Sequence, residues 1–138
     1  MNNVIQVTEH FAIKQHRAAH DDLIACRCCG RIIFDDPFFE HIHRVEEMRV
    51  ELGFGLRMTC GHRCTLHNAS VGGAAASVHL DFASDIQPWN ADPVKLNEIF
   101  VLAEEMEFDG IGKYNSFCHL DSRSLYSRPA PARWDNRT

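Results

Sequence analysis

The sequence predicts a single α+β domain in which helices pack on a small, mainly antiparallel sheet. The chain has 138 residues, enough for one ordinary domain with a real core. Two long segments repeat apolar residues at helical spacing and begin with capping signals. Short apolar runs lie between and after them, bounded by glycine or proline, which is typical of strands and tight turns.

The N-terminal half is predicted to hold two helices. Residues 8–20 are expected to form a short helix that Thr8 caps. Residues 25–34 follow as a loop held by packed cysteines. A longer helix begins at Asp35-Asp36-Pro37, because an acidic cap binds free backbone N–H groups and proline suits the first turn. Apolar residues recur along it at spacings of three and four until Gly53.

Two histidines of this longer helix, His41 and His43, are interpreted as solvated. A strand is predicted over residues 56–59. Residues 65–71 are expected to form one or two helical turns, closed by Gly72-Gly73.

A second amphipathic helix is predicted in the C-terminal half. Asp85-Ile86 enters a strand, which residues 87–90 break. Asp92-Pro93 then repeats the signal of an acidic cap followed by proline, and apolar residues recur after it at helical spacing.

The last predicted strand carries His119, and Gly110 and Gly112 are expected to form the tight turn before it. Prolines and arginines follow, in a pattern typical of a flexible terminus. We therefore predict one domain over residues 1–125 and a flexible tail over residues 126–138.

Composition excludes several classes of protein. The chain is 45% apolar and 24% charged, which is typical of a soluble globular domain. No apolar run approaches the roughly 18 residues that span a bilayer, so no membrane partner is expected. The net charge of −5 and the lack of a basic stripe argue against nucleic acid. Residues 1–20 are polar and show no secretory signal.

Histidine and aspartate side chains in two segments suggest a metal site. His79 and Asp85 lie six residues apart, and His119 and Asp121 follow in a short apolar run. Alternate side chains of an extended segment face the same way, so each pair can share a face. Catalytic zinc takes three nitrogen, oxygen or sulfur ligands and keeps one position open. Two adjacent strands would therefore offer His79, Asp85 and His119 to one ion, although surface or core histidines also fit this spacing.

The residues around these positions resemble the zinc D-alanyl-D-alanine carboxypeptidase-like peptidases. The resemblance covers about residues 8–123, and the order and most of the spacing match. Its motifs are Cys60-Gly61-His62-Arg63-Cys64, His67-Asn68, Val71-Gly72-Gly73, Ser77-Val78-His79, Gly110-Ile111-Gly112-Lys113-Tyr114 and Phe117-Cys118-His119-Leu120-Asp121.

This resemblance implies a sheet that carries zinc bound by His79, Asp85 and His119. It implies a metallopeptidase that hydrolyses D-amino-acid-containing peptide bonds of bacterial peptidoglycan, as a D-Ala-D-Ala carboxypeptidase or a phage endolysin-like endopeptidase. Peptidoglycan stem peptides would be its partners. Because no signal is visible, we expect a cytoplasmic protein that reaches the cell wall after phage lysis or by delivery with a virion.

The resemblance also implies roles for Arg63 and Ser77, and the strand that bears His119 suggests one for Asp121. Arg63 and Ser77 would bind substrate, and the guanidinium of Arg63 suits a terminal carboxylate held by two parallel hydrogen bonds. A structural ion pair is the alternative for Arg63. Asp121 is assigned as the catalytic base, or as the acceptor of a hydrogen bond from a ligand imidazole. Both interpretations of Asp121 stay open.

The chain departs from the family pattern at two important places. The spacing from His79 to Asp85 is one residue shorter than in the family, which makes Asp81 an alternative ligand. Ser116 stands where many relatives have a catalytic acid. These departures support an alternative function, that of a catalytically inactive peptidoglycan-binding or structural homologue.

The six cysteines permit two interpretations. A reducing compartment favours free thiols or metal ligands over disulfides, and thiolates suit zinc. The spacing fits no standard zinc knuckle, so a packed or oxidisable cluster is favoured over a structural zinc site. Cys118 is expected in the core. The cysteines are Cys26, Cys28, Cys29, Cys60, Cys64 and Cys118.

Overall fold

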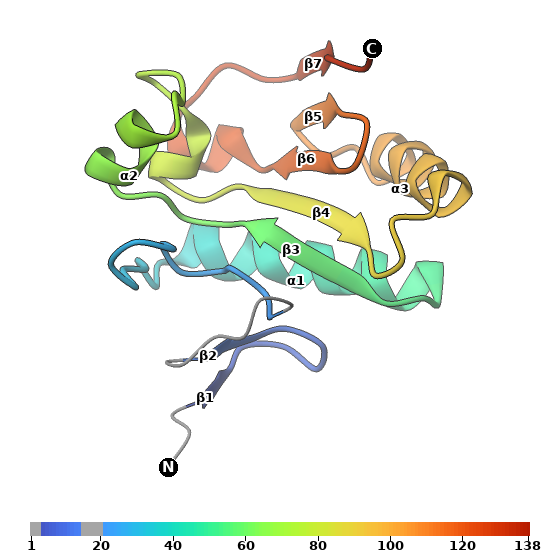
Figure 1. Cartoon of the computed structure of the whole chain (residues 1–138), viewed down its shortest axis with the longest axis horizontal. Helices are drawn as coiled ribbons and strands as arrows, with labels where there is room; N and C mark the ends of the chain where they lie inside the picture. Colours follow the sequence, from blue (N-terminus) through green and yellow to red (C-terminus); the bar gives the residue numbers. More distant parts are fainter. Residues whose placement is uncertain (1–3, 15–20) are drawn as a thin grey trace.

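A five-stranded sheet forms the centre of the computed structural model, which describes residues 4–14 and 21–138 (Figure 1). The strand order is β3-β4-β6-β5-β7, with antiparallel pairing except between β5 and β7. The predicted α+β fold with a mainly antiparallel sheet is confirmed. The strands are β3 (Leu56–Cys60), β4 (Ser84–Pro88), β5 (Gly110–Lys113), β6 (Cys118–Asp121) and β7 (Ala132–Asp135).

Two long helices begin where the sequence predicts. Helix α1 (Asp36–Leu52) is capped by Asp35, whose carboxylate accepts from the backbone N–H of Phe38 at 2.9 Å, and it ends at Gly53 in a left-handed conformation. Helix α3 (Pro93–Glu105) is capped by Asp92. Among the described residues, no helix is long and apolar enough to cross a membrane.

The sheet has one apolar face and one polar face. Ile86, Cys118 and Leu120 pack in the core with apolar side chains of α1 and α3. Successive side chains of a strand point to opposite faces, so Asp85 and His119 lie on the face away from this core. The prediction that Cys118 is a core residue is confirmed.

His41 is a correction to the sequence analysis, because it is fully buried rather than solvated. Its Nδ1 lies 2.8 Å from the hydroxyl of Ser122, and its Nε2 lies 2.7 Å from the hydroxyl of Ser84. Burial lowers the pKa of His41 to about 3, so the ring is neutral at physiological pH. His43 is exposed, as expected.

The N-terminal prediction is wrong over the residues that the structure describes. Residues 12–14 form strand β2 (Ala12–Lys14), which pairs with β1 (Val4–Gln6) in a separate two-stranded sheet. The remainder of the predicted helix, residues 15–20, lies outside the described residues. The strand pairing offers the backbone a partner that a helical spacing pattern does not reveal.

Two C-terminal expectations also need correction. Gly110 and Gly112 do not form a turn but belong to β5, and the turn into β6 follows Lys113. The flexible tail predicted from residue 126 instead contributes β7, which pairs in parallel with β5. Figure 1 shows β7 along the edge of the sheet, close to the C-terminus.

His41 gives a prediction about stability. His41→Leu fills the core position with an apolar side chain but leaves the buried hydroxyls of Ser84 and Ser122 without their partner. We expect the free energy of unfolding to fall by about 2–4 kcal/mol, measured by urea denaturation. The control is His43→Ala on the exposed side of the same helix, which should change it by less than about 0.5 kcal/mol. Equal stability of His41→Leu and the wild type would refute a structural role for this imidazole.

Candidate metal centre

Strands β4 and β6 bring two of the expected ligands face to face. Their antiparallel register pairs Asp85 directly with His119. Side chains opposite each other in this way have Cβ atoms about 4.5–5.5 Å apart. The two residues are 34 positions apart in the sequence and become neighbours only through this strand pairing.

His79 reaches the same place from a different element. It lies in the 3₁₀ helix η1 (Val78–Leu80), and not in an extended segment as the sequence analysis assumed. The hydroxyl of Ser77 caps this helix by accepting from the backbone N–H of His79 at 3.2 Å. The backbone N–H of Arg63 donates to the carbonyl of His79 at 2.7 Å, which ties η1 to the segment after β3.

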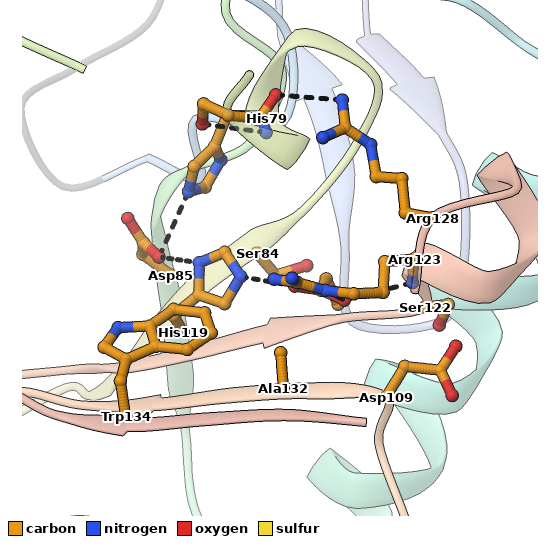
Figure 2. Close-up of polar contacts among 12 residues, drawn as sticks. His79, Ser84, Asp85, Asp109, His119, Ser122, Arg123, Arg128, Ala132 and Trp134 are labelled. Atoms are coloured by element: carbon orange, nitrogen blue, oxygen red, sulfur yellow. Dashed lines mark hydrogen bonds and ion pairs between the residues drawn. The ribbon is translucent and has the colours of Figure 1, made fainter. Parts of the chain in front are cut away.

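Three potential ligand atoms converge between these elements (Figure 2). His79 Nε2 lies 3.3 Å from Asp85 Oδ1, and His119 Nδ1 lies 3.2 Å from the same oxygen. The other nitrogen of each ring is already a donor. His79 Nδ1 donates to the carbonyl of Gly61 at 2.7 Å, and His119 Nε2 donates to Asp121 Oδ2 at 2.7 Å. In the neutral rings, both nitrogens that face Asp85 therefore carry lone pairs.

The charges of this group reinforce each other. Burial opposes ionisation of Asp85, but hydrogen bonds from His119 and His79 in their protonated forms hold the pKa of its carboxyl well below the usual range. Burial likewise lowers the pKa of His79, but contacts with Asp85 and Cys60 raise it to about 10. Without a cation, proton uptake by His79 would neutralise Asp85. A divalent metal would instead meet two imidazole lone pairs and one carboxylate, a donor set that fits zinc.

Comparison with known proteins decides the family. The Peptidase M15 family model matches residues 16–121, a span that contains His79, Asp85 and His119. The chain belongs to the Peptidase M15 family. Members of this family are zinc peptidases, in agreement with the donor set. No curated protein and no solved structure gives a significant match.

Asp121 lies behind the second histidine of this M15 site. Its carboxylate is fully buried and accepts from His119, from the guanidinium of Arg123 and from the Arg123 backbone N–H. Figure 2 shows Arg123 on the side of the His119 ring away from Asp85. A side chain at Gly110 would collide with this carboxylate, so glycine is required there. The geometry fits the hydrogen-bond acceptor among the two interpretations of Asp121.

A cleft of about 460 Å³ opens over His79, Asp85 and His119. Arg63 lines it together with His79, Asp85 and His119, so the structure brings Arg63 to the predicted site. Ser77 is not among the lining residues, and its hydroxyl is engaged in capping η1. Ser116 is exposed in the turn between β5 and β6.

The alternative ligand Asp81 is engaged elsewhere. Its Oδ2 accepts from Arg128 Nε at 3.1 Å and from Arg128 Nη2 at 2.9 Å. Arg128 also donates to the carbonyls of Ala76 and Ser77, so it joins the C-terminal segment to the loop that carries His79. The oxygen that both imidazoles approach belongs to Asp85.

Trp134 and Cys60 lie next to the two histidines that face Asp85. The indole of Trp134 on β7 lies 4.8 Å from the His119 ring and donates to Tyr114 Oη at 2.9 Å. The sequence gives no clear signal for Trp134, because the alternating pattern of Ala132-Arg133-Trp134 follows two prolines. Cys60 Sγ lies 3.6 Å from His79 Nδ1 and accepts from Arg63 Nε at 3.2 Å, so it connects the cleft arginine to His79.

The ligand geometry predicts different effects for two neighbouring aspartates. Asp85→Ala removes the oxygen that faces both imidazoles and should lower the zinc content by about one ion per chain, measured by elemental analysis of protein purified with zinc. Asp81→Ala breaks only the ion pair with Arg128 and should keep the metal. The assignment fails if Asp81→Ala loses zinc while Asp85→Ala retains it.

Proposed function

We propose that this M15 protein is a zinc-dependent peptidase that hydrolyses D-amino-acid-containing peptide bonds of bacterial peptidoglycan. The observation that carries the proposal is the convergence of His79 Nε2, Asp85 Oδ1 and His119 Nδ1 below a cleft that Arg63 also lines. Three protein ligands below an open cleft suit a catalytic rather than a structural zinc. Stem peptides of the cell wall are the proposed substrates, reached after lysis or virion delivery.

Some residues of the site would bind zinc, and others orient the imidazoles that would bind it. Zinc held by His79, Asp85 and His119 would supply Lewis-acid activation of a peptide carbonyl and of water at neutral pH. The carbonyl of Gly61 and the carboxylate of Asp121 each fix the tautomer of one ligand imidazole. We therefore assign Asp121 as a positioning residue. Arg123 and the burial of Asp121 keep that carboxylate directed at His119.

Arg63 suits recognition of a substrate carboxylate. Its Nη1 donates to Asn68 Oδ1 at 2.9 Å and its Nε donates to Cys60 Sγ, so two contacts within the protein orient the guanidinium. Among the described residues, no carboxylate forms an ion pair with Arg63, which weakens the structural ion-pair interpretation. An oriented guanidinium loses little freedom when it binds a carboxylate.

A second candidate function follows from the scarcity of acidic side chains in the cleft. Among the described residues that line it, Asp85 is the only carboxylate, and Ser116 stands where many relatives have an acid. A site that holds zinc without a proton acceptor beside it would bind stem peptides with little turnover. This is the inactive peptidoglycan-binding homologue.

Turnover of peptidoglycan separates the two functions. Purified protein should release peptide products from isolated peptidoglycan, detected by mass spectrometry. A chelator should abolish the release and added zinc should restore it. His119→Ala should be inactive, while the exposed-site control His43→Ala should match the wild type. Zinc-loaded protein that sediments with peptidoglycan but releases nothing would establish the binding homologue instead.

Arg63→Lys tests carboxylate recognition. Lysine keeps the charge but loses the planar fork of donors. We expect zinc content and folding to persist while kcat/KM falls by about 10-fold or more, equivalent to about 1.4 kcal/mol. A substrate amidated at its C-terminus should show a much smaller difference between the two proteins. Equal turnover of the free-carboxylate substrate by wild type and Arg63→Lys would exclude this role.

A further inference from the structure

Four cysteines gather at one point outside the cleft. Cys26, Cys28 and Cys29 come from the irregular segment before α1, and Cys64 caps helix α2 (Thr65–Ser70). One sulfur from each of the four lies within 4.8 Å of every other. Cys28 Sγ is 3.6 Å from Cys26 Sγ and 3.3 Å from Cys64 Sγ. The long separation in sequence between Cys64 and the other three explains why no standard knuckle spacing is visible.

These distances approach those of a tetrahedral thiolate site. Four sulfurs at about 2.3 Å from zinc lie about 3.8 Å from one another. The two measured separations are within a few tenths of an ångström of this value. A disulfide would join two of these sulfurs and leave two thiols beside it, whereas one zinc ion uses all four.

Backbone amides around the cluster favour the charged form of the Cys26 sulfur, whereas neighbouring thiols raise the pKa of Cys28 and of Cys29. The N–H of Cys64 donates to Cys26 Sγ at 3.3 Å, and the N–H groups of Cys28 and Cys29 are further donors to the same sulfur. The N–H of His67 donates to Cys64 Sγ at 3.4 Å. Burial raises the pKa of Cys26, but these amide contacts lower it to about 6.

We propose that Cys26, Cys28, Cys29 and Cys64 bind a structural zinc ion, separate from the site formed by His79, Asp85 and His119. The thiols release their protons on binding, and no electron is transferred. This proposal reverses the preference that sequence spacing alone supports. It does not depend on peptidase activity.

The place of the cluster in the fold indicates what the ion does. Residues between β2 and α1 form no helix or strand over the described range 21–35. Leu23 and Ile24 hydrogen-bond through the backbone to Met58 and His62, whereas the backbone bonds of Cys26 to Gly30 and Arg31 stay within the segment. Zinc would fasten this segment to the N-terminus of α2. Arg63 immediately precedes Cys64, so the same ion would hold the cleft arginine and α2 in position.

The proposal is tested by the zinc content of a variant without the cleft histidines, measured with and without further cysteine substitutions. The double variant His79→Ala/His119→Ala removes the cleft site and should retain about one zinc per chain through the four thiolates. Adding Cys28→Ser and Cys64→Ser to it should reduce zinc to near zero. Cys118→Ala is the matched control, because this thiol lies in the core, and it should leave zinc in that background unchanged.

Cobalt provides a test that needs no cysteine variant. The His79→Ala/His119→Ala protein loaded with Co²⁺ should show the strong thiolate-to-metal charge-transfer absorption of a four-sulfur site. Titration with a thiol reagent should find four of the six thiols protected by metal and exposed by chelator. Absence of bound metal and of this absorption in the folded double variant would overturn the proposal. A disulfide found by mass spectrometry between any two of the four would overturn it as well.

Discussion

The pairing of β4 with β6 is the constraint on which the site depends. Its register sets Asp85 opposite His119 and turns both side chains to the polar face, while Ile86 and Leu120 enter the core. A slip of one residue would send the charged groups into the core and the apolar groups out. The free energy of core burial therefore enforces the register, and the register builds most of the donor set.

The polar face could not be buried without compensation for its charges. Asp121 has no exposed surface, yet its oxygens are satisfied by His119 and by Arg123. A buried carboxylate without such partners would be strongly destabilising. Glycine at position 110 leaves room for this carboxylate, and Trp134 covers His119 from β7. The supporting residues come from the last quarter of the chain, so the C-terminal strand belongs to the architecture of the site.

Local chemistry made some of this structure predictable. Asp35 and Asp92 mark both long helices, because a cap and a following proline act within a few residues of sequence. Resemblance to known zinc peptidases pointed to His79, Asp85 and His119, although it could not say that η1, and not a strand, carries His79. Asp121 lies on the same strand face as His119, as alternation along a strand predicts, whereas its ion pair with Arg123 has no signal in the sequence.

What the sequence concealed depends on contacts between distant residues. His41 looked like a solvated helix residue, and only the approach of Ser84 and Ser122 explains how a neutral imidazole is satisfied in the core. Strand β7 is short and follows prolines, so its pairing with β5 leaves no local signal. The cysteine cluster likewise forms only when the segment before α1 meets the start of α2.

Anomalous diffraction at the zinc absorption edge, from crystals of the zinc-loaded protein, tests the central claim most directly. The account predicts a peak about 2.0–2.2 Å from His79 Nε2, Asp85 Oδ1 and His119 Nδ1. A peak bound by His119 through Nε2, or a cleft without a peak in zinc-saturated crystals, would contradict it.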